Sequence, residues 1–168
     1  HHELGEISRR CERQLAQLAE ASRDDNRLRL ALLDGRADLA PFLRDHAGRM
    51  ARIAQLDVLE LVDARGEIMS SAHHRNEFGT FDTGLLRVLE RLDRPPSARH
   101  PWLECREFRA TGPTGSWSSL SAHAAFTVER SAHDRRLALV VGRPFQLGDR
   151  SFSWIGGQYV EPAGAILA

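Results

Sequence analysis

The sequence predicts an α+β domain: an antiparallel sheet of about five strands, with a long N-terminal helix and a second helix packed on one face. Two features of the hydrophobic pattern lead to this fold class. In the first third of the chain, apolar residues recur at spacings of three and four, which is typical of amphipathic helices. From Leu56 onward they fall in short alternating segments bounded by turn residues, which is typical of strands joined by hairpins.

The N-terminal segment, residues 3–55, should be helical. A helix of about five turns is expected over residues 3–23, because one face carries an apolar stripe made of Leu4, Ile7, Cys11, Leu15 and Leu18. A second helix should begin near Asp38 as its N-cap, with Pro41 tolerated in the first turn.

The sheet region, residues 56–155, should open with a β-hairpin. Strands are expected at 56–62 and 67–72, joined by a type I turn with Asp63 first and Gly66 last. Apolar side chains on both faces of the first strand predict that it lies inside the sheet. The rest of the region should supply one helix at about 82–93 and further strands at 102–110, 117–130, 135–142 and 151–155.

One domain is expected for 168 residues, with residues 156–168 as an exit segment that follows the pair Gly156-Gly157. The chain starts within a helix and ends on the apolar stretch AGAILA, so we expect a piece of a larger protein. No apolar run approaches the roughly 20 residues that span a bilayer, and no secretory signal peptide opens the chain.

The charged residues exclude several classes of protein. The formal net charge is zero, so the electrostatic footprint of a nucleic-acid-binding protein is missing and no nucleic-acid partner is expected. All 23 basic residues are arginines. Without lysine, a P-loop, a Schiff-base enzyme and a lysine general base are all excluded.

The two cysteines, Cys11 and Cys105, lie far apart and form no CxxC motif. Cys11 falls on the apolar stripe of the first helix, so a buried free thiol is expected there. Whether the two cysteines pair is left open.

The segment HHRNE, residues 73–77, is the strongest candidate for chemistry. A metal site is disfavoured, because His73 and His74 would point to opposite faces of a strand and a structural zinc needs about four ligands. No serine lies in a G-x-S-x-G motif, so nothing indicates a hydrolase. We therefore predict that the chain is not an enzyme and has neither catalytic residues, nor a metal, nor a cofactor.

A pocket remains, because it needs only polar and aromatic side chains that converge beside the sheet. Arg75 and Arg143 are suited to bind a carboxylate or phosphate, and Trp117 is suited to cover a ring or an aliphatic group. The alternative is that each is an ordinary loop or surface residue. The predicted ligand-binding residues are His73, Arg75, Asn76, Trp117, His123 and Arg143.

Three stretches resemble a known family. LELVDARGEIMSSAHHRNEFG (59–79) is similar to the first sheet hairpin of extracytoplasmic PAS-like (Cache-type) sensor domains of bacterial histidine kinases. LALVVG (137–142) and WIGGQYVEPAGAIL (154–167) are similar to their closing strand and its exit toward a second membrane helix. The family's ligands vary, so the resemblance assigns no binding residue.

The resemblance implies a periplasmic ligand-sensing domain of an inner-membrane histidine kinase that belongs to a two-component system. Binding of an unknown small molecule would move the leading helix. The stripe on residues 4–18 is then also a candidate contact between two copies, forming a homodimer. The alternative is a ligand-free protein-interaction or dimerisation module of a membrane receptor.

Overall fold

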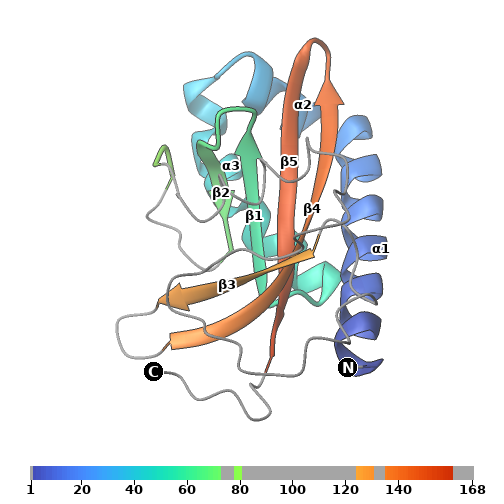
Figure 1. The fold of residues 1–168 in the computed structure, drawn as a ribbon. Helices are drawn as coiled ribbons and strands as arrows, with labels where there is room; N and C mark the ends of the chain where they lie inside the picture. Colours follow the sequence, from blue (N-terminus) through green and yellow to red (C-terminus); the bar gives the residue numbers. More distant parts are fainter. Residues whose placement is uncertain (1, 73–77, 81–123, 131–134, 161–168) are drawn as a thin grey trace.

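The computed structural model describes residues 2–72, 78–80, 124–130 and 135–160 (Figure 1). Within these ranges, helices come first and strands follow. The helical elements are α1 (His2–Asp24), α2 (Asn26–Leu33), the 3-10 turn η1 (Ala37–Leu39) and α3 (Ala40–Ala54). The strands are β1 (Val58–Asp63), β2 (Ile68–Ser71), β3 (Ala124–Arg130), β4 (Arg135–Leu147) and β5 (Arg150–Tyr159).

The strands form a five-stranded sheet in the order β2-β1-β5-β4-β3, with antiparallel pairing between all neighbours. The last strand of the described residues, β5, therefore lies in the middle, where it pairs with β1 of the N-terminal hairpin on one side and with β4 on the other. The predicted fold class, an α+β domain with an antiparallel sheet, is confirmed.

The helices cover one face of the sheet, as the sequence predicts. α1 packs along β4 and β5, whereas α3 packs against β1 and β2 (Figure 1). The main core fills the space between these layers; its fully buried members include Cys11, Leu15, Leu59, Leu61 and Trp154. The opposite face carries a second, smaller apolar cluster: Val58, Val62, Ile68, Ala138, Val140 and Ile155.

The start of α3 differs from the prediction. Asp38 does not cap the helix; it lies within η1, and its carboxylate accepts hydrogen bonds from the Arg36 guanidinium at 2.8 and 3.0 Å. The side-chain cap is found instead at α2, where Asp25 Oδ1 accepts from the backbone N–H groups of Arg27 and Leu28 at 2.9 Å each. A charged partner two residues away thus outcompetes the capping role at Asp38.

The hairpin between β1 and β2 is confirmed. The backbone N–H of Gly66 donates to Asp63 O at 3.1 Å, and Gly66 has a φ of 85°, a region that favours glycine. Asp63 Oδ1 also accepts from the backbone N–H groups of Arg65 and Glu67, both at 2.9 Å. Every residue of β1 is buried, in agreement with an interior strand.

The final hairpin is longer than predicted. β4 continues through Pro144 to Leu147, and β5 continues through Gly156-Gly157 to Tyr159, so the two glycines are part of a central strand and not the start of an exit segment. Their small size is required there: a Cβ on Gly157 would lie 1.8 Å from the Leu139 carbonyl oxygen. The predicted helix 82–93 and strand 102–110 lie outside the described residues.

Candidate functional site

Of the six predicted ligand-binding residues, the structure describes only Arg143. His73, Arg75, Asn76, Trp117 and His123 lie outside the described residues. Arg143 is exposed on β4, opposite Trp154 in the strand register, which places it on the helix-bearing side of the sheet. The role of all six in ligand binding stays a prediction.

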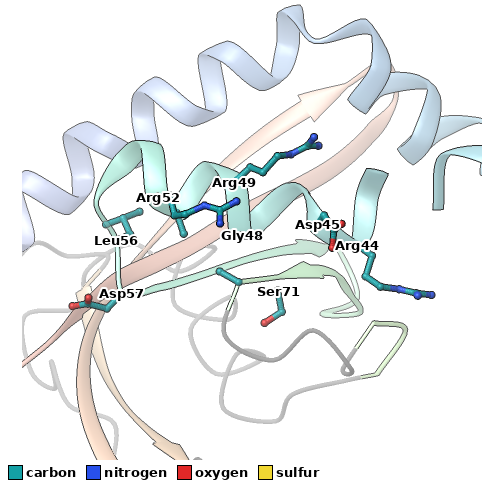
Figure 2. Close-up of a pocket in the computed structure, with 10 residues that line it drawn as sticks. Arg44, Asp45, Gly48, Arg49, Arg52, Leu56, Asp57 and Ser71 are labelled. Carbon is teal, nitrogen blue, oxygen red and sulfur yellow. The ribbon is translucent and has the colours of Figure 1, made fainter. Parts of the chain in front are cut away.

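A groove opens between α3 and the β1–β2 hairpin, next to the point where β2 ends (Figure 2). Its volume is about 550 Å³, within the range of small-molecule sites. The last lining residue, Ala72, directly precedes His73 in the chain. The groove is lined by Arg44, Asp45, Gly48, Arg49, Ala51, Arg52, Leu56, Asp57, Ser71 and Ala72.

Helical periodicity brings the polar lining of the groove together. Arg44, Gly48 and Arg52 are spaced four apart on α3 and therefore share one face of the helix. A different face, with Leu43, His46 and Ala47, is buried against the sheet. The same amphipathic helix thus fills the core and presents arginines beside the hairpin.

Hydrogen bonds hold the walls of the groove in place. The backbone N–H of Ala47 donates to Ser70 Oγ at 2.9 Å, which ties the middle of α3 to β2. At the end of α3, the Leu56 N–H donates to Ala51 O at 2.9 Å, and Asp57 Oδ2 accepts from the Tyr159 N–H at 3.0 Å. The groove is therefore framed by fixed backbone on both sides.

The groove carries three arginines and two aspartates. Arg44 and Arg52 are exposed, and no ion pair among the described residues involves either of them. Arg49 is half-buried, with its Cζ 4.9 Å from the centre of the Phe42 ring, and Arg27 lies over the same ring at 4.4 Å. The α3 wall thus presents positive charge that its surroundings compensate only in part.

Comparisons with known proteins bear on the fold. No protein-family model and no curated protein matches the sequence. Among solved structures, the E. coli DcuS sensor domain matches with a TM-score of 0.47 and 12% identity over 89% of this chain and 88% of that domain. The sensor domain of the V. cholerae histidine kinase DctB matches with a TM-score of 0.50 and 12% identity, over 94% of this chain and 56% of that one. This chain has the fold of the DctB sensor domain.

The sensor-domain fold confirms the predicted PAS-like architecture. The chain spans little more than half of the DctB sensor domain. Within the described part of the chain, no helix is long and apolar enough to cross a membrane. The described residues also contain no group of three or more His, Cys, Asp or Glu side chains that could hold a metal ion.

Within this sensor-domain fold, a chain of contacts runs from α3 through the sheet to α1. The His46 ring on α3 lies 5.8 Å from the Trp154 ring on β5, centre to centre. Trp154 Nε1 donates to Ser22 Oγ on α1 at 2.9 Å, and this hydroxyl donates to Leu18 O at 2.7 Å. All three side chains are buried, so a shift of α3 has a direct mechanical route to α1.

The arginines of α3 are not among the residues predicted from the sequence. The prediction for this helix concerns only its start, at Asp38 and Pro41. The available signal was the glycine in the middle of FLRDHAGRMARIA (42–54), flanked four residues away on each side by an arginine.

Proposed function

We propose that this chain is the periplasmic ligand-sensing domain of a membrane-bound histidine kinase in a two-component system. One observation carries the proposal: contacts connect a wall of the groove to α1. The helix α3 forms that wall, its buried His46 contacts Trp154, and Trp154 donates a hydrogen bond to Ser22 on α1. A ligand that draws α3 and the hairpin together thereby acts on the leading helix.

The ligand acts by selecting one arrangement of the helices. A small molecule shifts the equilibrium between two arrangements only by the difference in its affinity for them. Contacts to both α3 and β2 provide such a difference, because the distance between these walls changes when α3 moves. His73, Arg75 and Asn76 follow the groove residue Ala72 directly, and in this proposal they complete the rim of the site.

A homodimer, if the sensor forms one through α1, uses a different face from the one expected. The apolar stripe on residues 4–18 was the candidate contact, but Cys11, Leu15 and Leu18 are buried against the chain's own sheet. Two copies would have to meet through the opposite face of α1, where Arg9, Arg13 and Glu20 are exposed. The alternative, a ligand-free protein-interaction or dimerisation module of a membrane receptor, would likewise need a contact surface other than this stripe.

The test is a thermal-shift screen of the domain against pools of small metabolites, followed by calorimetry of each hit. Sensing predicts a saturable ligand that raises the melting temperature and changes amide exchange in α1. The variant Trp154→Phe should still bind the ligand but should show a smaller change in α1. If no small molecule stabilises the domain, or if a bound ligand leaves α1 unaffected, the proposal is wrong.

A further inference from the structure

We propose that the domain has a second input, the proton: uptake of a proton by His46 releases α3 from Trp154 and thereby acts on α1. This inference goes beyond the proposed function, which concerns a small molecule in the groove, and rests on it only for the route to α1. Three features of the structure carry it: the position of His46 between α3 and the sheet, its unpartnered ring nitrogen, and the cations around the neighbouring Phe42 ring.

His46 lies at the contact between α3 and the sheet. Only 4% of the residue is exposed, and its ring lies 5.1 Å from that of Phe42 on the same helix and 5.8 Å from that of Trp154 on β5, centre to centre. The next residue, Ala47, is tied to β2 by the hydrogen bond from its N–H to Ser70 Oγ. A change in the charge of this ring therefore acts directly on the packing of α3 against the sheet.

The site suits a neutral ring and not a charged one. His46 Nδ1 is buried without a hydrogen-bond partner among the described residues, whereas a protonated imidazole carries an N–H group on both nitrogens. The proton on Nδ1 would then lack an acceptor in a buried site, which is costly for a charged group. Burial accordingly lowers the pKa of His46 from 6.5 to about 4.

Two arginines already contact the Phe42 ring beside His46. Arg27 Cζ lies 4.4 Å and Arg49 Cζ 4.9 Å from the centre of this ring, so a protonated His46 would be a third cation around one aromatic group. The charge of Arg49 opposes protonation of His46, whereas that of Asp25, the N-cap of α2, favours it. Proton uptake is therefore easier once α3 has moved and water solvates the ring.

The other elements packed around His46 and Trp154 offer a protonated ring no compensating charge. Beside Trp154 in the sheet lie Leu61 of β1 and the exposed Arg143 of β4, while β2 contributes Ser70 and α1 contributes Ser22. Of these groups only Arg143 is charged, and it too is a cation.

Acid should shift the balance between docked and released α3. His46 takes up a proton near pH 6.5 when released and near pH 4 when docked, so lowering the pH from 7.5 to 5 should raise the ratio of released to docked molecules about thirtyfold. Trp154 Nε1 donates to Ser22 Oγ on α1 at 2.9 Å. A Trp154 ring that loses its contact with His46 thus passes the change to α1.

The experiment is an NMR titration of the domain from pH 7.5 to 4 that follows the Cε1–H of His46, the indole N–H of Trp154 and the amide N–H of Ser22. We expect all three signals to shift with one common midpoint, which lies below the 6.5 of an ordinary histidine. Far-UV circular dichroism over the same range should retain the helical signal. In His46→Leu, the signals of Trp154 and Ser22 should no longer show this transition.

Two charge variants should move the midpoint in opposite directions. Asp25→Asn removes the favourable charge but keeps a capping side chain, so it should lower the midpoint. Arg49→Gln removes the opposing charge and should raise it. The matched control Arg13→Gln, on the exposed side of α1, should leave it unchanged. A purely structural role of His46 would not produce these opposite shifts.

Three outcomes overturn the proton input. They are signals of Trp154 and Ser22 that do not follow His46, a transition that persists in His46→Leu, and loss of the helical signal in the same transition, which would mean general unfolding. A metabolite that alters α1 at constant pH, while acid leaves α1 unaffected, overturns only this inference. An acid response of α1 in a domain that binds no metabolite overturns only the sensing of a small molecule.

Discussion

At the scale of single residues, His46 is the most unusual titratable group that the structure describes. Its ring lies between those of Phe42 and Trp154, at 5.1 and 5.8 Å, and only 4% of the residue is exposed. Burial lowers the pKa of His46 from 6.5 to about 4. Its Nδ1 is buried without a hydrogen-bond partner among the described residues. The folded chain therefore holds this imidazole neutral.

We predict a loss of stability in mild acid that depends on His46. The unfolded chain takes up a proton at His46 near pH 6.5, whereas the folded chain resists it until about pH 4. The contribution of His46 to stability is thus fully present above pH 6.5 and is lost as the pH falls toward 4, by roughly 3 kcal/mol in all. Urea unfolding at a series of pH values measures this loss.

The variant His46→Leu is the control for this titration, since it removes the proton site and the unsatisfied nitrogen while keeping an apolar side chain. Carboxylates and the other histidines titrate in both proteins, so the difference between the two curves isolates His46. A parallel pair of curves between pH 7 and 4 would show that His46 does not carry the effect.

The turn and helix-cap residues show what could be predicted for individual residues. Asp63 and Gly66 were predicted correctly, because a turn between two strands imposes its residue types locally. Asp38 was wrong as a cap, because the choice among neighbouring polar residues depends on a competing partner, Arg36, that local preference does not weigh. The capping role of Asp25 was missed because the start of α2 depends on how the chain turns after α1.

At the scale of elements, the strand β5 decides the topology. It pairs with β1 on one side and β4 on the other, so it joins two segments, 58–63 and 135–147, that are far apart in sequence. Its two glycines resemble a strand end when the sequence is considered alone. They belong inside the strand because the neighbouring backbone and side chains approach too closely for a Cβ, and this is a property of the packed sheet rather than of the local sequence.

We predict a graded response to alanine at three glycines. A Cβ on Gly157 would meet backbone, so Gly157→Ala should lower the free energy of unfolding by about 3 kcal/mol or more. A Cβ on Gly156 would lie 2.8 Å from Leu59 Cδ1 and 3.1 Å from both Leu15 Cδ2 and the Val58 carbonyl oxygen, so its shortest contact is with a flexible side chain and the loss should be smaller. Gly48→Ala should stabilise, because a Cβ on Gly48 meets no atom within 4 Å and alanine favours the helix. Urea denaturation of the three variants gives the order, and an equal effect at Gly156 and Gly157 would contradict it.

The two elements that line the groove, the β1–β2 hairpin and α3, differ in how far their part of the site could be predicted. The hairpin prediction correctly located the end of β2, and Ala72, the last lining residue, directly precedes the predicted HHRNE segment. The opposite wall depends on α3 lying beside that hairpin. Which helix face meets which strand is set by the packing of the whole core, so the arginines that flank Gly48 in the sequence could be placed beside the hairpin only once the two elements were seen side by side.

At the scale of the whole molecule, the proposed function requires α1 to be docked on the sheet and movable. α1 lies along β4 and β5 (Figure 1), and its apolar stripe is buried in the main core. The close approach of Leu15 to Gly156 fixes the helix at its middle. One native side chain on this interface, Cys11, is chemically reactive when exposed and can therefore report on docking.

We predict that Cys11 is protected from alkylation as long as α1 is docked. The thiol is free and fully buried, as the sequence predicts, and burial raises the pKa of Cys11 to about 11. Iodoacetamide reacts with an exposed thiolate, so both effects slow the reaction. At pH 8 in a Cys105→Ser background, which leaves one thiol, alkylation should be roughly a hundredfold slower in the folded protein than in urea.

The same measurement tests whether docking is what protects the thiol. Leu15→Ala removes a fully buried side chain one turn from Cys11, which typically costs about 2–5 kcal/mol in a core, and should accelerate alkylation without changing the rate in urea. The control Arg13→Gln lies on the exposed side of α1 and should leave both rates unchanged. Mass spectrometry over time gives the rates. Equal rates for folded and unfolded protein would mean that α1 does not rest on the sheet, and a ligand in the groove would then have no route to the leading helix.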